Sequence, residues 1–248
     1  MLIPALAIGG DAYSGARGRA KKADYATALR QMMEDAGKAE KTRGDISHEM
    51  ARRGGAENVV VFEHPNPSFI GKSFESLAVS RGITPVQMAL ELQYEGFRDR
   101  PGGARLPGFS VWEDDVEAIM AQRWNMTSTE AGVALPEDGP DTHARYYGSY
   151  PRKLQRYALE RSVISIEDAV RSSTSLPAQV LRIRDRGLPR EGMMADVVVF
   201  DPAKVRDRST FSDPHHYSEG IDYVLVNGKA VVDGGKPTGA LAGTVLSR

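Results

Sequence analysis

The sequence contains no cysteine, so disulfide bonds, thiolate metal ligands and cysteine nucleophiles are excluded. A bound metal would need His, Asp, Glu or a modified Lys as its ligands. The missing cysteines also fit a reducing compartment. Long apolar runs are missing as well: residues 1–9 are apolar, but Pro4 interrupts them and they lack the basic segment of a secretory signal. We therefore expect a cytoplasmic protein without a membrane span.

An excess of either charge is also absent. The 248 residues carry 32 basic and 33 acidic side chains, a formal net charge of −1, and both signs are spread along the chain. A nucleic-acid interface or an anionic membrane surface requires a basic patch, and the sequence shows none. We expect neither partner. The hydrophobic share of 41% is sufficient for a buried core in a chain of this length.

Apolar spacing in the first quarter of the chain predicts an α/β fold. Residues 22–37 carry an apolar face at helical spacing, with Leu29 near its centre, and this predicted surface helix ends at Gly37. A second helix is predicted over residues 46–53. The continuous apolar run at residues 58–63 is typical of a strand buried on both faces. A helix followed by a buried strand indicates an α/β architecture.

Two further helices are predicted from their capping residues. Thr84 is followed by proline, and Gln87 completes a capping box. Ser110 repeats this pattern ahead of a helix whose apolar residues we expect to face inward. Those apolar residues are Val111, Val116, Ile119 and Met120. A short strand, residues 126–129, is predicted to follow and to end at the carboxylate of Glu130.

Loops and turns separate the remaining elements. Residues 96–108 are basic and rich in turn formers, which suits a mobile loop, and residues 136–141 form another loop. Helices are predicted over residues 151–161 and 166–174.

The last sixty residues are predicted to be rich in β-structure. Two short apolar runs, residues 223–226 and 229–232, are joined by Asn227 and Gly228. Both of these residues readily take the positive φ of a type I′ turn, so the pattern predicts a β-hairpin.

Four ordered motifs carry a resemblance to a known family. They are residues 66–78, 112–132, 143–152 and 192–233. Together they resemble the D-aminoacylase family, the N-acyl-D-amino-acid deacylases of the amidohydrolase superfamily, from about Arg43 onward. The resemblance implies a zinc-dependent hydrolase that cleaves the linear amide of a small N-acyl amino acid. The Gly-Met-Met-Ala-Asp stretch that begins at Gly192 and the hairpin after it would belong to a side sandwich away from the active site.

The same resemblance implies a fold class and a division of the chain. Members of the family have a (β/α)8 barrel flanked by a small β-sandwich, with the active site at the carboxyl ends of the strands. Residues 58–63 would be the seventh barrel strand and residues 126–129 the eighth. We expect residues 1–57 to be a helical insert or lid, 58–186 the last part of the barrel, and 187–248 a sandwich segment. Residues 1–41 are expected to cover the site or the open barrel edge.

The histidines depart from the family pattern. The family's metal ligands begin with a His-x-His pair on the first strand, and no such pair occurs here. The five histidines are His48, His64, His143, His215 and His216. The chain therefore resembles the carboxyl half of such an enzyme. Two strands cannot close an eight-strand barrel, so the strand edges must be covered. A truncated gene, a separately encoded amino-terminal half, self-association and a rearranged fold all remain open.

The resemblance assigns roles to three residues. Glu130 matches the aspartate that takes a proton from metal-bound water and returns one to the leaving amine. Glutamate is one methylene longer, and a misplacement of about 1 Å can cost roughly 10²-fold in rate. Arg145 would grip the substrate carboxylate as a bidentate fork, with His143 as its neighbour in the substrate site. Structural roles remain the alternatives: a strand-end carboxylate, a surface arginine and a loop-packing histidine.

No metal ligand is predicted within the chain. His64 follows a predicted strand beside Glu63, but the turn sequence after it argues against ligation. His215 and His216 are adjacent in an extended segment, so their side chains point to opposite faces. Tyr146, Tyr147 and Arg152 are expected to pack the loop or the following helix. Two other functions remain open: a non-catalytic remnant or regulatory subunit, and a hydrolase of cyclic amides.

Overall fold

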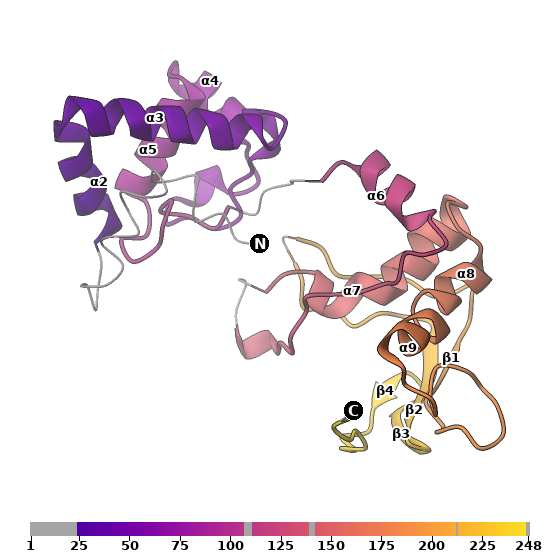
Figure 1. The fold of residues 1–248 in the computed structure, drawn as a ribbon. Helices are drawn as coiled ribbons and strands as arrows, with labels where there is room; N and C mark the ends of the chain where they lie inside the picture. Colours follow the sequence, from indigo (N-terminus) through magenta and orange to yellow (C-terminus); the bar gives the residue numbers. More distant parts are fainter. Residues whose placement is uncertain (1–23, 107–110, 139–141, 212, 247–248) are drawn as a thin grey trace. The chain divides into compact units, whose positions relative to one another are not determined.

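The computed structural model describes residues 24–106, 111–138, 142–211 and 213–246. The chain forms two compact units, Met1–Trp112 and Glu113–Arg248, and each is described by itself (Figure 1). Ser110, the predicted helix cap, lies outside the described residues, as do residues 1–23 of the predicted lid segment. None of the described helices combines the length and the apolar character that crossing a bilayer requires.

The first unit begins with two helices that meet at Asp35. They are α2 (Tyr25–Glu34) and α3 (Ala36–Ala51). The predicted helix end at Gly37 is wrong, because the Asp35 carboxylate accepts the backbone N–H of Lys38 at 3.0 Å and caps α3. Gly37 therefore lies inside α3. An aspartate that can satisfy a free helix N–H is a stronger boundary signal than a glycine two residues later.

Two shorter helices complete the first unit, α4 (Phe74–Arg81) and α5 (Pro85–Glu95). The predicted capping box at the start of α5 is confirmed. The Thr84 hydroxyl accepts the Gln87 N–H at 3.1 Å, and the Gln87 amide oxygen accepts the Thr84 N–H at 2.9 Å. The helices enclose a core of side chains that are at most 2% exposed. These include Leu29, Ile46, Val59, Val61, Phe74, Leu77, Met88 and Leu92.

Residues 58–63 do not form the regular strand that was predicted. They follow a short 3-10 turn, η1 (Ala56–Asn58), and run extended with Val59 and Val61 fully buried. Their backbone hydrogen bonds go to residues 71–74 on one side and to Arg105 on the other. These contacts are isolated bridges, and a regular ladder requires a continuous neighbouring strand.

The loop after α5 is packed, so the prediction of a mobile loop does not hold for residues 97–106. The buried Gln93 accepts the Gly102 N–H at 2.7 Å and donates to the Arg100 carbonyl oxygen at 3.3 Å. Leu106 is 4% exposed. The second 3-10 turn of the unit, η2 (Pro67–Phe69), starts at the cap Asn66 and ends before Ile70.

Helices of the second unit precede its strands. They are α6 (Glu113–Met120), η3 (Pro136–Asp138), α7 (Arg145–Arg152), η4 (Lys153–Glu160), α8 (Ile166–Arg171) and α9 (Ser175–Leu181). The helix predicted over residues 151–161 starts earlier, at Arg145, and changes from α to π geometry after Pro151. Proline has no N–H to donate to the carbonyl four residues earlier, and such interruptions favour a π turn.

Two predictions for residues 111–130 are wrong. None of the apolar side chains of α6 is buried: Val116 and Met120 are half-buried and Ile119 is 51% exposed, while Val111, just before the helix, is 59% exposed. Residues 126–129 form no strand and run as an irregular segment. A backbone hydrogen bond of 2.8 Å, from the Thr127 N–H to the Ser172 carbonyl oxygen, connects them to the rest of the unit.

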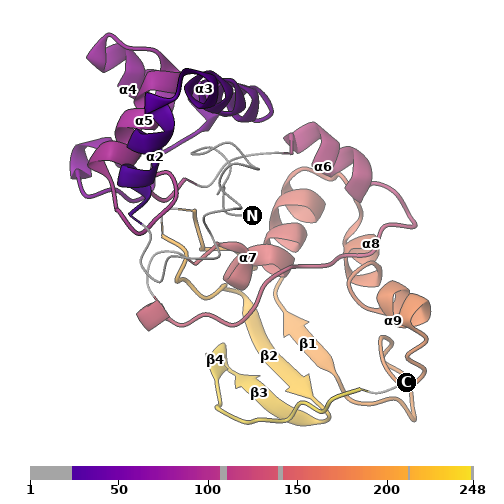
Figure 2. The same ribbon diagram turned by 60° about the vertical axis from the view of Figure 1, so that its left-hand side comes forward.

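The strands form one antiparallel sheet in the order β1-β2-β3-β4 (Figure 2). They are β1 (Val197–Phe200), β2 (Ile221–Val226), β3 (Lys229–Asp233) and β4 (Lys236–Pro237). The predicted hairpin is confirmed, since Asn227 and Gly228 join β2 to β3 with φ of 49° and 78°. Asp196 accepts the Asn227 N–H at 2.8 Å and thereby ties the turn to the residue before β1.

Candidate functional site

The segment that carries Glu130 lies along helix α7. The hydroxyls of Thr129 and Ser149 form a hydrogen bond of 3.0 Å. Because the Ser149 hydroxyl donates to a backbone carbonyl oxygen, Thr129 is the donor of this bond. The Tyr147 hydroxyl donates to the Ala134 carbonyl oxygen at 2.7 Å. Two residues of α7 therefore anchor the segment on either side of Glu130.

This docking brings Glu130 and Arg145 together. A carboxylate oxygen of Glu130 lies 3.3 Å from Nη1 of Arg145. The Glu130 side chain is 83% exposed, and that of Arg145 is 30% exposed. A pair with one partner in water contributes little stability. Nε of Arg145 is buried and has no hydrogen-bond partner among the described residues.

His143 lies at the start of the same helix. Its Nδ1 accepts the backbone N–H of Arg145 at 3.0 Å, and its ring meets that of Phe211 edge to face at 5.3 Å. The bond satisfies one of the free N–H groups at the beginning of α7. His143 thus holds the backbone of Arg145.

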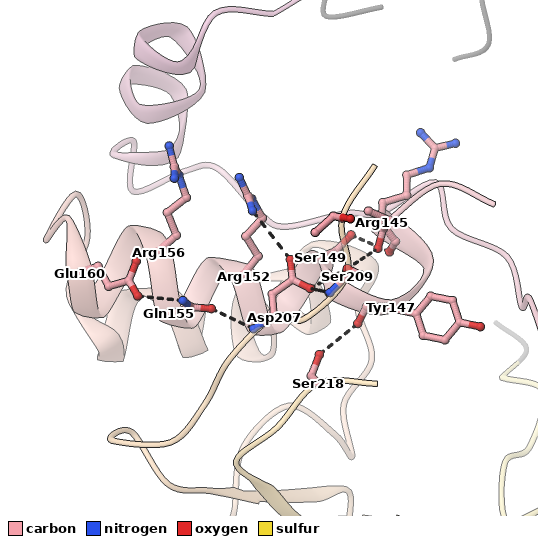
Figure 3. Close-up of polar contacts among 12 residues, drawn as sticks. Arg145, Tyr147, Ser149, Arg152, Gln155, Arg156, Glu160, Asp207, Ser209 and Ser218 are labelled. Atoms are coloured by element: carbon pink, nitrogen blue, oxygen red, sulfur yellow. Dashed lines mark hydrogen bonds and ion pairs between the residues drawn. The ribbon is translucent and has the colours of Figure 1, made fainter. Parts of the chain in front are cut away.

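The C-terminal part of the chain docks on α7 through Asp207 (Figure 3). The carboxylate of Asp207 is 6% exposed and lies 3.8 Å from Nη1 of Arg152. It accepts the N–H of Ser209 at 2.9 Å and its hydroxyl at 2.6 Å. A side chain at position 148 would collide with it, because a Cβ on Gly148 would lie 2.2 Å from the carboxylate oxygen. The glycine is required for this close approach.

Lys153, a buried lysine at the start of η4, contacts the segment that carries Thr127 and the residues that follow α8. The residue is 4% exposed, and its Nζ donates to the hydroxyls of Ser172 at 2.6 Å and Ser173 at 3.2 Å, and to that of Thr127. Burial lowers the pKa of Lys153 to about 8. Sequence reasoning missed this residue, since a lysine between Arg152 and a helical stretch is ordinarily a surface residue.

The other histidine-bearing segments are engaged in local contacts. His64 is 4% exposed, accepts the Asn66 N–H on Nδ1 at 2.9 Å, and packs on Phe69. Burial lowers the pKa of His64 below its ordinary value, although nearby backbone groups and Glu95 oppose the shift. Glu63 pairs with Arg100 at 2.6 Å.

The adjacent histidines, His215 and His216, contact different residues. His215 contacts Tyr147 at 3.0 Å, and His216 contacts Asp213 at 2.7 Å. As the sequence predicted, the two rings do not converge on one point.

The described residues do not fit a zinc site of their own. No group of three His, Asp or Glu side chains among them lies close enough to hold a metal ion. Glu130 faces the guanidinium of Arg145, and Nδ1 of His143 is used by a backbone N–H. A cation next to an arginine would be repelled. The described part offers a carboxylate at Glu130 and a guanidinium at Arg145.

The chain is similar to known proteins in sequence and in structure. Residues 23–232 match the model of the Amidohydrolase family. A D-aminoacylase from Alcaligenes xylosoxydans xylosoxydans is 35% identical over 190 residues, which are 77% of this chain and 37% of that protein. A solved D-aminoacylase structure, described by its binuclear metal centre, superposes with a TM-score of 0.59 at 34% identity, over 77% of this chain and 38% of its own. The N-acyl-D-glutamate deacylase of Bordetella bronchiseptica, solved with zinc and a phosphonate inhibitor, gives 0.53 at 30% identity, over 78% and 39%. The chain thus spans less than two fifths of the length of each.

Proposed function

The chain belongs to the amidohydrolase family, and we propose that it supplies the carboxyl-terminal part of an N-acyl-D-amino-acid deacylase. In this proposal Glu130 is the acid/base group and Arg145 binds the substrate carboxylate, with His143 beside it. The observation that carries the proposal is the docking of the Glu130 segment on α7, which places the two side chains 3.3 Å apart. The names of the relatives, D-aminoacylase and N-acyl-D-glutamate deacylase, support a linear N-acyl amino acid as substrate.

The donors of Arg145 suit a carboxylate. A guanidinium binds a carboxylate best through two parallel N–H groups. Nε of Arg145 is buried without a partner, and Nη1 makes only a long contact to the exposed Glu130. The parallel pair that includes Nη1 is completed by Nη2, and a substrate carboxylate would bind these two groups in place of Glu130. The backbone of Arg145 is held by His143, which limits the positions that the guanidinium can reach.

Glu130 can perform the proton transfers that amide hydrolysis requires. One carboxylate takes a proton from the attacking water, and the same group returns a proton to the nitrogen of the departing amine. Glu130 is itself the anion beside Arg145 before substrate binds. The carboxylate of the substrate would displace it there, so that binding leaves Glu130 free to accept the proton.

The proposal extends to the parts of the complete enzyme. Residues 58–186 would contribute the last part of a (β/α)8 barrel, residues 187–248 a segment of the β-sandwich, and residues 1–57 an insert or lid. The zinc of the solved relative would be held by side chains outside the described residues, because those residues do not form a zinc site. Another segment or a second chain would provide them.

A second candidate function is a non-catalytic or regulatory subunit. It is favoured by the glutamate at position 130, where the resemblance expects an aspartate, and by the lack of a His-x-His pair in the sequence. The absence of a metal-binding group among the described residues favours it as well. In that case the second unit would serve association with another amidohydrolase chain.

The experiment compares the purified chain with an assembled form. The coding DNA upstream of Met1 is sequenced for a segment of about two hundred residues that encodes His-x-His, and its product is added if it exists. Alone, the chain should bind less than one zinc and hydrolyse no N-acetyl-D-amino acid. The assembled form should hydrolyse these substrates. Stoichiometric zinc on the chain alone would contradict the proposed origin of the ligands.

Variants of the assembled form test the two residues. Glu130→Gln should lower kcat by about 10²–10⁴-fold, whereas Glu137→Gln, a change at an exposed carboxylate nearby, should leave it unchanged. Arg145→Lys should raise KM, because a lysine cannot form the bidentate fork. Full activity of Glu130→Gln would refute its catalytic role. Hydrolysis of a hydantoin, with none of N-acetyl-D-amino acids, would identify a cyclic-amide hydrolase, and no hydrolysis in either form would favour the regulatory subunit.

A further inference from the structure

The hydroxyl of Tyr147 joins two segments that are distant in sequence. It lies 2.7 Å from the Ala134 carbonyl oxygen and 3.0 Å from Nδ1 of His215. The tyrosine ring meets the rings of His215 and Tyr217 edge to face, each at 5.6 Å between centroids. The Glu130 segment, helix α7 and the segment before β2 therefore converge on one side chain.

A count of protons determines the direction of these hydrogen bonds. The Tyr147 hydroxyl has one hydrogen, and a carbonyl oxygen can only accept. The hydrogen therefore goes to Ala134, and Nδ1 of His215 must donate to the phenol oxygen. Burial raises the pKa of Tyr147, with Tyr217, Asp138 and Glu137 adding to the shift, so the phenol retains its proton at neutral pH.

The backbone of Tyr147 is held as well. Pro151 stands four residues later and has no N–H to give to the Tyr147 carbonyl oxygen. The Ser218 hydroxyl donates to this oxygen instead, at 3.4 Å (Figure 3). The next residue, Gly148, lies directly against Asp207. The hydroxyl of Tyr147, its carbonyl oxygen and the residue that follows it are thus all held by contacts. A hydroxyl held in this way can position a segment that is otherwise irregular.

We propose that Tyr147 is a positioning residue for Glu130, whose segment it fixes on α7 by donating to Ala134 while accepting the Nδ1–H of His215. The second anchor, Thr129 on Ser149, holds the other side of Glu130. This inference rests on the proposed function for the role of Glu130. The hydrogen bonds themselves can be tested without catalysis.

The test replaces Tyr147 with phenylalanine, which keeps the ring and removes only the hydroxyl. The matched control is Tyr150→Phe, the same change at a 41% exposed tyrosine of the same helix. Imidazole ¹⁵N shifts of the purified chain should show His215 with its proton on Nδ1. In Tyr147→Phe the proton should leave Nδ1 for Nε2, the more common tautomer. Backbone order parameters of residues 130–135 should fall in this variant and not in the control.

A second variant keeps the inference falsifiable if Tyr147→Phe does not fold. His215→Leu removes one bond and leaves the bond to Ala134, so the order parameters of residues 130–135 should stay near the wild-type values. A wild-type His215 protonated only on Nε2 would overturn the inference, and so would unchanged order parameters in Tyr147→Phe. Loss of order in His215→Leu equal to that in Tyr147→Phe would overturn it as well.

Kinetics of the assembled form separate the inference from the proposed function. A displacement of Glu130 by up to about 1 Å should lower kcat in Tyr147→Phe by roughly 10- to 100-fold, with no rise in KM because Arg145 is not moved. Loss of order in residues 130–135 without a fall in kcat would leave the hydrogen-bond assignment intact and refute the role of Glu130. A fall in kcat with unchanged order would refute positioning by Tyr147.

Discussion

Replacing Lys153 with methionine should stabilise the protein at neutral pH. The lysine is 4% exposed, has three hydroxyl partners and forms no ion pair with a carboxylate among the described residues. A charge that is removed from water without an opposite charge is costly, and an apolar side chain of similar length avoids this cost. Methionine also adapts to the shape of the site.

The magnitude follows from the pKa. Burial lowers the pKa of Lys153 from 10.5 to about 8, and this difference corresponds to about 3 kcal/mol. The loss of partners should subtract little, because the hydroxyls of Ser172 and Ser173 also donate to backbone carbonyl oxygens of α8. We expect Lys153→Met to unfold with a free energy about 1–3 kcal/mol higher than the wild type at pH 7.

The pH dependence gives a sharper signature. Between pH 8 and pH 10.5 the unfolded chain binds a proton on Lys153 that the folded chain has lost, so the wild type gains stability as the pH rises through this range. The penalty is fully present below pH 8 and absent above pH 10.5. The advantage of Lys153→Met should therefore shrink steadily from pH 8 upward.

Urea denaturation followed by circular dichroism, at several values between pH 7 and pH 10.5, measures this difference. Lys204→Met is the control, since the Lys204 side chain is 74% exposed and its change should lie within about 0.5 kcal/mol. Titrating groups other than Lys153 and Lys204 are shared by all three proteins and cancel. A variant less stable than the wild type at pH 7, or a difference that does not vary with pH, would show that the hydroxyls compensate the buried charge.

Two further predictions concern packing and capping. Gly148→Ala should lower the free energy of unfolding by about 1–3 kcal/mol, because the new methyl group would collide with the buried Asp207. Gly44→Ala, the same change in the open part of α3, should instead raise it by up to about 1 kcal/mol; thermal unfolding that shifts both variants in the same direction would contradict this assignment. Thr84→Ala should cost about 0.5–2 kcal/mol through the lost cap of α5, and an unchanged midpoint in urea would show that the capping box is not needed.

Local signals were sufficient for several elements. The capping box of α5 and the turn at Asn227 and Gly228 were predicted correctly, because their hydrogen bonds and dihedral angles depend on residues at most three positions apart. Asp35 shows the limit of such signals: the helix end was predicted at Gly37, whereas Asp35, two positions earlier, caps α3.

Predictions that needed distant partners fared worse. Residues 58–63 have the composition of a buried strand, but the described neighbours offer only isolated bridges. The apolar side chains around α6 have helical spacing, yet Ile119 remains exposed within its unit. Helix α7 was predicted to begin at Pro151, because nothing in the preceding sequence indicates that His143 accepts the Arg145 N–H.

The family followed from the sequence, and so did the hypothesis that Glu130 and Arg145 belong to the site, since ordered motifs and residue types can be read along the chain. Only the tertiary structure decided that these two side chains pair with each other, that Tyr147 anchors the segment between them, and that Lys153 is buried. Caps and turns depend on neighbours in the chain. Burial and pairing depend on segments that folding brings together from 13 to 68 positions apart, as the two bonds of the Tyr147 hydroxyl show.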